Sequence, residues 1–266
     1  MSAWDSYINL TEIRGRTKRG SALRRTVERL NNRIPDTLSY QEAVIYSRET
    51  GFRYTDGEEM VGTTRNVAII NSDNLNEKTI IAMPGDDIEH GCLVFWMGNH
   101  WLVTERDANT TVYTKAKMIQ CNHLLHWMTE DGNICEQWCV IEDGTKYLTG
   151  ELEDRNFVVT RGDSRISMTI ARNEETIRLN REHRFLIDDP ESPIKLAYQL
   201  TKPLKLGWSF NGDGVYKFVL QEVTATINDD IVNGIADYYK YYPNNNSSGA
   251  DANPDPINPN GKKVWL

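Results

Sequence analysis

The clearest structural signal in the chain is the run Leu93-Val-Phe-Trp96, Met97-Gly-Asn99 and His100-Trp-Leu-Val-Thr104. Two short apolar segments, each carrying aromatic and β-branched residues, flank a turn that contains glycine and asparagine. A turn of this kind between two apolar segments is typical of a β-hairpin. We therefore predict two antiparallel strands, joined at Met97–Asn99, in the middle of the chain.

Short segments of the same kind continue on both sides of this hairpin, from about residue 52 to residue 228. Asp-Gly and Pro-Gly pairs separate them, and such pairs favour turns. The other expected strands are Val67–Ile70, Thr79–Met83, one that begins at Ile134, Asn156–Thr160, Ile166–Ile170 and Tyr216–Leu220. Many short strands without alternating helices predict a mainly β fold with a barrel- or sandwich-like body, and argue against a doubly wound α/β fold.

The N-terminal part of the chain differs from this body. Apolar residues recur there at helical spacing, which predicts a short amphipathic helix over residues 22–33 with Ser21 as its N-cap. The apolar positions are Leu23, Val27, Leu30 and Ile34. Residues 1–20 are polar and basic, and we expect them to form an extended arm. Residues 39–50 carry both helix and strand signals, and we favour a strand because Val44-Ile-Tyr46 is β-branched and aromatic.

The C-terminal part is also distinct. Ile231, Ile235 and Tyr238 fall on one helical face and predict a short C-terminal helix. Residues 243–266 are rich in proline and asparagine and contain too few apolar residues to offset their ordering entropy, so we expect a second extended arm. The expected organisation is a basic arm and helix over 1–38, a β-rich body over 39–242 with a possible division near residue 150, and a tail over 243–266.

Charge is distributed unevenly along the chain. Residues 1–34 hold eight basic and three acidic side chains, for a net charge of +5, so the remaining residues of this chain of net charge −8 sum to −13. A basic arm on an acidic body indicates two different partners. Because binding to nucleic acid depends on neutralisation of phosphates by Lys and Arg, the acidic body disfavours wrapping around nucleic acid.

The basic segment allows three interpretations: docking on an acidic protein surface, contact with nucleic acid, and a solvated helix face. We favour a protein partner, because arginine outnumbers lysine there by seven to one and pairs with carboxylates in a bidentate manner. Trp4 and Trp265, close to the chain ends, are candidate aromatic anchors on another subunit. The predicted docking residues are Trp4, Arg14, Arg16, Arg19, Arg24, Arg25 and Trp265.

Membrane insertion and secretion are not expected. The longest apolar run, Cys92–Met97, has six residues, whereas a membrane-spanning helix needs about 20. The N-terminus shows no apolar segment of a secretory signal. The sequence therefore predicts a protein that stays in the compartment where it is made, with its four cysteines reduced.

Three of those cysteines form the best metal-like pattern together with two histidines. Two Cys and two His side chains could bind zinc, but the two cysteines of the predicted strand at 134 would lie about 13 Å apart at ~3.3 Å per residue. We favour ordinary core cysteines and expect no cofactor. The residues concerned are Cys121, His123, His126, Cys135 and Cys139. The tryptophans of the body, Trp96, Trp101, Trp127 and Trp138, are expected in the core.

Catalytic motifs are missing from the sequence. It contains no nucleophile elbow, Walker A sequence, metalloprotease helix motif or dinucleotide-binding glycine motif, so we do not expect an enzyme. The acidic pairs Asp86-Asp87, Asp188-Asp189 and Asp229-Asp230 lack the spacing of a calcium loop, and we interpret them as solvated turn residues. Arg161-Gly-Asp163 matches an adhesion tripeptide, and we interpret it as a turn between two strands.

One pattern of residues runs through the body in a fixed order. Its first part is Thr79-Ile-Ile-Ala-Met-Pro84-Gly85, Gly91, Trp101-Leu-Val-Thr104, Asp107, Asn109, Tyr113, Lys115, Ile119, Cys121-Asn122, Leu125 and Trp127. Its second part is Glu175-Thr176, Arg184-Phe-Leu-Ile187, Gly214-Val-Tyr216 and Asp229-Asp230 through Ile235-Ala-Asp-Tyr238. This pattern, over roughly residues 75–240, resembles that of the head-closure, or head–tail connector, proteins of tailed bacteriophages.

The resemblance implies a β-rich structural protein of the virion neck, assembled in the host bacterial cytoplasm and without catalytic residues. Its copies would form a ring between portal and tail that closes the head and helps to retain packaged DNA. The implied partners are a portal or adaptor ring above, a tail terminator or tail tube below, further copies of the chain, and double-stranded DNA bound without sequence specificity. Two alternatives stay open: another phage tail-completion or baseplate subunit, and a zinc-dependent nucleic-acid-binding module.

Overall fold

The computed structural model describes residues 17–55, 57, 59–107, 112–129, 131–143, 165–188, 192, 195–206, 209–210 and 212–241. Of these residues, 49% lie in strands and 13% in helices, which confirms the mainly β prediction. The predicted strand Asn156–Thr160, the Arg161–Asp163 turn, most of the N-terminal arm and the C-terminal tail fall outside the described residues. Among the residues that the structure does describe, no helix is long and apolar enough to cross a membrane.

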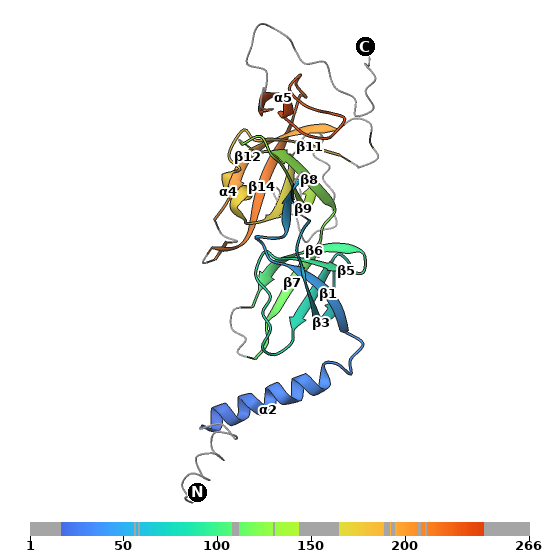
Figure 1. Cartoon of the computed structure of the whole chain (residues 1–266), viewed down its shortest axis with the longest axis vertical. Coiled ribbons are helices and arrows are strands. Elements are labelled where there is room, and N and C mark those ends of the chain that lie inside the picture. The colour runs from blue at the N-terminus through green and yellow to red at the C-terminus, as the bar shows by residue number, and fades with distance from the viewer. Residues whose placement is uncertain are drawn as a thin grey trace, which may run out of the picture.

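Six antiparallel strands form a closed barrel in the first part of the chain (Figure 1). Their order around the barrel is β1-β3-β4-β7-β6-β5. The strands are β1 (Tyr40–Tyr46), β3 (Thr63–Asn71), β4 (Glu77–Ala82), β5 (Leu93–Trp96), β6 (Asn99–Arg106) and β7 (Lys115–Gln120). The strand β1 confirms the preference for a strand over residues 39–50.

The hairpin that marks the sequence most clearly is present as predicted. β5 pairs with β6 in a register that places Trp96 opposite Asn99. Met97 and Gly98 connect them with φ angles of 48° and 77°. A two-residue turn with positive φ at both positions matches the right-handed twist of the flanking strands, which is why a Gly-containing turn is required here.

The second part of the chain forms an eight-stranded sheet that curves into half a barrel. Its main order is β11-β12-β14-β10-β9-β2, with β8 paired to β9 and β13 to β14. The strands are β2 (Phe52–Tyr54), β8 (His123–Met128), β9 (Ile134–Asp143), β10 (Arg165–Ala171), β11 (Arg184–Ile187), β12 (Leu196–Leu204), β13 (Ser209–Phe210) and β14 (Asp213–Val223). The chain first enters this sheet at β2, between the barrel strands β1 and β3, and passes to it again at residues 121–122, ahead of the division near residue 150 that the sequence suggests.

The N-terminal helix is longer than predicted. It spans α2 (Lys18–Arg33), and the Thr17 hydroxyl caps it by accepting a hydrogen bond from Gly20 N at 3.0 Å. Ser21 is therefore not the N-cap, and residues 18–20 are helical rather than extended. The apolar residues at helical spacing that predict the helix begin only at Leu23. The first turn of α2 contains none of them, so the sequence pattern does not reveal it.

Two short helices differ from the prediction in the second part of the chain. α4 (Glu174–Arg178) was not expected; the Asn173 side chain caps it in a capping box with Thr176. The predicted helix over 231–238 is wrong in position, because residues 231–237 form a turn and α5 spans Tyr238–Tyr241. The Asp230 carboxylate accepts a hydrogen bond from Asn233 N at 3.1 Å, which stabilises the turn.

Each sheet has its own apolar core, and a third cluster joins them. The barrel core includes Trp101, and the second core includes Trp127; both side chains are buried as predicted, whereas Trp96 and Trp138 are only partly buried. The joining cluster takes buried residues from both sheets: Leu93, Leu102, Cys121, Val140, Ala171 and Val215. The ring of His100 also stacks on Trp138 across this junction, with centroids 4.4 Å apart.

The backbones of the two sheets meet most closely at two glycines. Gly214 N on β14 donates a hydrogen bond to His90 O in the barrel at 3.1 Å. A Cβ at Gly91 would overlap with the carbonyl group of Gly214, and Gly91 has a φ of +88°. Both observations explain why glycine is required at position 91.

The Gly91→Ala substitution tests this constraint. We expect it to lower the free energy of unfolding by about 3 kcal/mol or more, because it combines a strained φ with a backbone clash. Gly98→Ala is the matched control: its φ is +77°, yet no atom lies within 4 Å of the added Cβ, so about 1 kcal/mol is expected. Urea unfolding of both variants provides the comparison, and equal losses would contradict the clash.

Candidate functional site

The helix α2 is the first candidate site, because it combines an apolar stripe with a high positive charge. It carries six basic side chains and one acidic one over 16 residues. None of its residues is buried. Figure 1 shows α2 beyond the barrel, connected to β1 by residues 34–39. A helix of this length gains most of its stability in proteins from packing of its apolar face, so this face is suited to bind another surface.

The arrangement of side chains on α2 follows from helical geometry. Leu23, Val27 and Leu30 share one side, and at 100° per residue Arg19 and Arg24 flank them. Arg25 points to the opposite side. Arg24 Nε pairs with Glu28 Oε1 at 3.0 Å within the helix, and both side chains are exposed. Of the predicted docking residues, Arg19, Arg24 and Arg25 lie on α2, whereas Trp4, Arg14, Arg16 and Trp265 fall outside the described residues.

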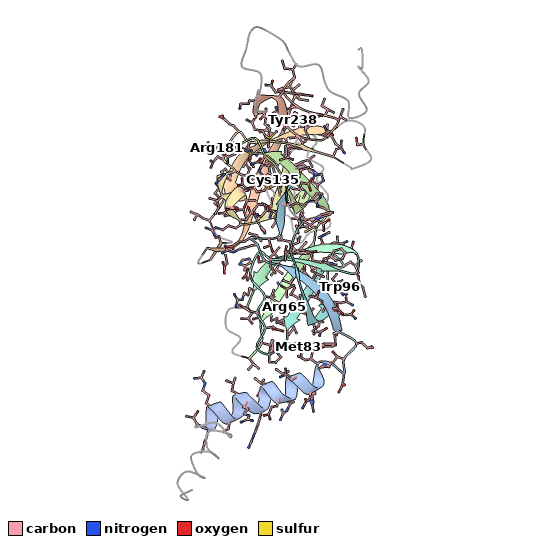
Figure 2. The ribbon with its side chains drawn as sticks, in the orientation of Figure 1. Arg65, Met83, Trp96, Cys135, Arg181 and Tyr238 are labelled. Atoms are coloured by element: carbon pink, nitrogen blue, oxygen red, sulfur yellow. The ribbon has the colours of Figure 1, made fainter. Side chains whose placement is uncertain are left out.

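The acidic charge is shared between the two sheets. Residues 35–51 and 55–122, which hold the barrel strands, carry 13 acidic and 6 basic side chains, for a net charge of −7, and residues 52–54 and 123–266, which hold the second sheet, sum to −6. Figure 2 shows the labelled Met83, in the turn after β4, at the end of the barrel nearest α2, and Tyr238 at the far end of the molecule. The basic helix α2 is therefore followed by two acidic parts of the chain, of which the barrel is the nearer.

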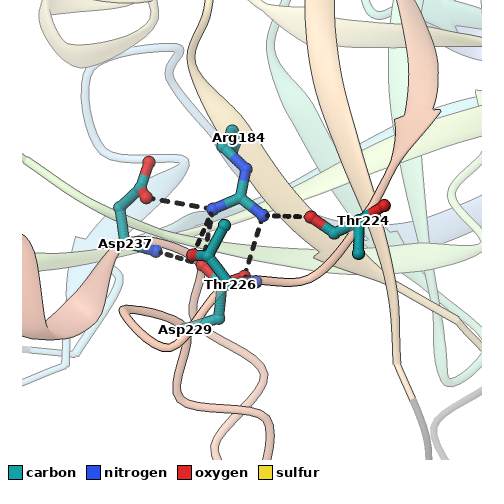
Figure 3. A network of polar contacts seen from close by, with 5 residues as sticks. All are labelled: Arg184, Thr224, Thr226, Asp229 and Asp237. Atoms are coloured by element: carbon teal, nitrogen blue, oxygen red, sulfur yellow. Dashed lines mark hydrogen bonds and ion pairs between the residues drawn. The ribbon is translucent and has the colours of Figure 1, made fainter.

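A buried ion-pair network lies in the second sheet (Figure 3). Arg184 on β11 donates to both carboxylate oxygens of Asp229, at 2.7 and 2.8 Å, and to Asp237 Oδ1 at 3.0 Å. Its guanidinium also donates to Thr224 O at 3.1 Å. The Asp229 side chain is 0% exposed. The network fastens the segment after β14 to the start of β11.

This network contradicts the interpretation of Asp229 as a solvated turn residue. Burial raises the pKa of its carboxyl, but hydrogen bonds from Arg184 and from the backbone N–H groups of Asp237 and Thr226 outweigh burial, so the pKa is lowered. Asp230 is also buried. By contrast, Asp86 and Asp87 are exposed, and Asp87 pairs with Arg106 at 2.8 Å.

Asp229→Asn tests the network through the pH dependence of stability. Removing one partner of a buried ion pair is expected to cost about 3 kcal/mol near neutral pH. A carboxyl with a lowered pKa stabilises the fold above its ordinary pKa of 3.8 and loses that contribution as the pH falls through the folded value. The difference from the unaltered chain should therefore be largest at pH 7 and shrink below about pH 4.

Asp131→Asn is the control for this prediction, because Asp131 pairs with Arg178 at 3.2 Å on the surface, where its side chain is 70% exposed. Such exposed pairs contribute less than about 1 kcal/mol. Chemical unfolding at several pH values would measure both variants. A pH-independent loss for Asp229→Asn would contradict the ionised network.

The cysteines of the metal-like pattern are buried in the interior, and its two histidines are half-buried. All four cysteines are buried and free of disulfides, as predicted. Burial raises the pKa of each thiol, to about 12 for Cys92, which keeps the thiols protonated. His126 Nε2 lies 3.3 Å from Glu136 Oε1, and burial together with His126 lowers the pKa of His123 to about 4. Within the described ranges, no group of three or more His, Cys, Asp or Glu side chains is placed to hold a metal ion.

Two shallow cavities lie on the second sheet. One, of about 190 Å³, is lined by cationic side chains that include Arg178, Arg181 and Lys240. Arg184 also lines it, but Asp229 and Asp237 already match its charge. The other, of about 290 Å³, lies between Arg48, Arg172 and Phe52; Arg48 and Arg172 both donate to the Gly212 carbonyl. Some of the cationic side chains that line each cavity are therefore already paired or hydrogen-bonded within the chain.

The structure brings together residues that the sequence pattern could not pair. Gly91 meets Gly214, and Arg184 meets Asp229, although each pair is separated by more than 40 residues. All four residues belong to the pattern quoted for the phage resemblance, and Asp229 was also noted as part of an acidic pair. Comparisons of the chain with models of protein families, with curated proteins and with solved structures found no match.

Proposed function

We propose that the chain is a structural protein of the neck of a tailed bacteriophage. Its copies form a ring between portal and tail, close the head and help to retain packaged DNA. The observation that carries the proposal is α2, a basic helix with an apolar stripe and no buried residue, next to an acidic barrel. Such a helix is suited to join one subunit to another.

The roles of the pattern residues support a structural protein. The residues that resemble the head-closure pattern include Gly91 and Gly214 at the junction of the two sheets, and Arg184 and Asp229 in the buried network. These residues maintain the framework and the pattern contains no catalytic set, so the proposed activity is assembly rather than chemistry. A β fold alone does not imply function, whereas the unburied basic helix and the acidic body are features suited to contacts between subunits.

The charge distribution agrees with contacts to both protein and DNA. The body of the chain, with a net charge of −7 in the barrel part and −6 in the second-sheet part, repels phosphates and would let a duplex move past without being gripped. The arginines of the N-terminal part can pair in a bidentate manner with carboxylates of a portal, adaptor or tail subunit. The proposed location of the assembled protein is the head–tail joint of the virion.

Deletion of the gene in the phage proposed to encode the chain tests this function. We expect heads that package DNA and then lose it, together with free tails, and rescue when the gene is supplied in trans. Electron microscopy and nuclease protection of packaged DNA would measure these outcomes. A tail-completion or baseplate subunit would instead leave stable DNA-filled heads, and normal tailed particles would contradict any essential structural role.

Removal of residues 1–20 tests the role of the N-terminal segment in assembly. The truncation deletes Arg14, Arg16, Lys18 and Arg19 together with the Thr17 cap of α2. We expect a folded chain, with unchanged near-ultraviolet circular dichroism, that is incorporated poorly into particles. A normal yield of intact, DNA-filled virions from the truncated gene would refute the role of this segment.

The zinc-dependent alternative has its own test. Elemental analysis of the purified chain would detect stoichiometric zinc if the cysteines and histidines bound it, and that result would favour a nucleic-acid-binding module over the neck protein.

A further inference from the structure

The outer face of the barrel carries an apolar row beside the start of β1. Side chains on β1, β3 and β4 alternate between the barrel core and this outer face. In the strand register Tyr40 lies opposite Ala68, and Ala68 lies opposite Ile81, so the three form a row across three strands. Ile70 continues the apolar surface along β3 and is 43% exposed. Ala68 is buried between its two half-buried neighbours, so Ile70 is the exposed apolar side chain of this surface, and Lys115 on β7 lies opposite Ile81 at the end of the row.

Acidic side chains lie on both sides of this row. Glu42 on β1 stands opposite Asn66, two residues before Ala68 along β3, and Asp73 follows the end of β3. Both side chains are exposed, and neither carboxylate has a hydrogen bond or ion pair within the described part of the chain. We refer to Tyr40, Glu42, Ala68, Ile70, Asp73 and Ile81 as the acidic barrel face.

The helix α2 presents the complementary arrangement. Its apolar stripe of Leu23, Val27 and Leu30 is flanked by Arg19 on one side and Arg24 on the other. A helix laid along the apolar row, across the strands, would direct one arginine toward Glu42 and the other toward Asp73. The match therefore includes an apolar centre and opposite charges on both edges.

We propose that α2 of one copy binds the acidic barrel face of a second copy of this chain. This inference deepens the proposed ring function and rests on it. Two different surfaces meet, so each copy donates one helix and accepts another, and such head-to-tail contacts generate rings when the rotation closes. Nucleic acid fits less well, because phosphates would leave the apolar stripe uncovered and the barrel repels them.

Paired charge reversals on α2 test the donor side. Arg19→Glu with Arg24→Glu changes the two residues that flank the stripe, and Lys18→Glu with Arg25→Glu changes their chain neighbours on the opposite side. The helix is about 10–12 Å wide, more than the ~8 Å screening length at physiological ionic strength. We expect the first pair to raise the dissociation constant for self-association by about tenfold or more, and the second pair to change it far less.

Acidic residues provide the matching acceptor pair. Glu42→Lys with Asp73→Lys should raise the dissociation constant by about tenfold or more, as the donor variant does. Asp86→Lys with Glu89→Lys is the control, because these two exposed acids lie in the loop between β4 and β5 and likewise have no side-chain partner among the described residues. Thermal unfolding of every variant verifies that it is folded.

Mixing the donor variant with the acceptor variant distinguishes this interface from others. The mixture retains one functional helix and one functional face, so sedimentation should show a dimer that cannot grow, whereas each variant alone stays monomeric. A mixture that stays monomeric, an intact chain that is monomeric, or association unaffected by Arg19→Glu/Arg24→Glu would overturn the proposal. A neck protein whose α2 binds a different subunit would pass the gene-deletion test and fail this one.

Discussion

The close approach of two backbones at Gly91 and Gly214 sets how the barrel and the second sheet meet. A side chain at position 91 would overlap with the Gly214 carbonyl, so the hydrogen bond from Gly214 N to His90 O depends on glycine there. The apolar cluster around Leu102 and Val215 then closes between the two sheets. Because the junction is packed and hydrogen-bonded, the barrel and the second sheet, with its Arg184 network, form one body.

The charge distribution follows the long axis of the molecule. The positive helix, the barrel part of the chain with a net charge of −7 and the second-sheet part with −6 follow one another along this axis (Figure 1). Opposite charges in one chain, with the helix unburied, favour contacts between chains. The contrast between a basic N-terminal segment and an acidic body therefore holds for both sheets, and the barrel is the acidic part that lies next to α2.

Patterns among neighbouring residues predicted those elements that depend on neighbouring residues alone. The Met97–Asn99 hairpin, the strand over residues 39–50 and the buried cysteines follow from alternation, turn residues and strand spacing. The first turn of α2 has no apolar period and depends on the Thr17 cap, so the sequence placed its start too late. The burial of Asp229 depends on Arg184, 45 residues away along the chain. The sequence around Asp229 shows an acidic pair in a turn and carries no information about a partner that is distant along the chain. For the same reason, the sequence identified the arginines of α2 as docking residues but did not identify the barrel face proposed to bind them.

A cryo-electron-microscopy reconstruction of the assembled chain in its particle would locate both the ring and the helix α2. We expect a ring between portal and tail in which density for α2 of each copy lies on the β1–β3–β4 face of the adjacent copy. A ring elsewhere in the particle, or α2 seated on the barrel of its own chain, would contradict this expectation.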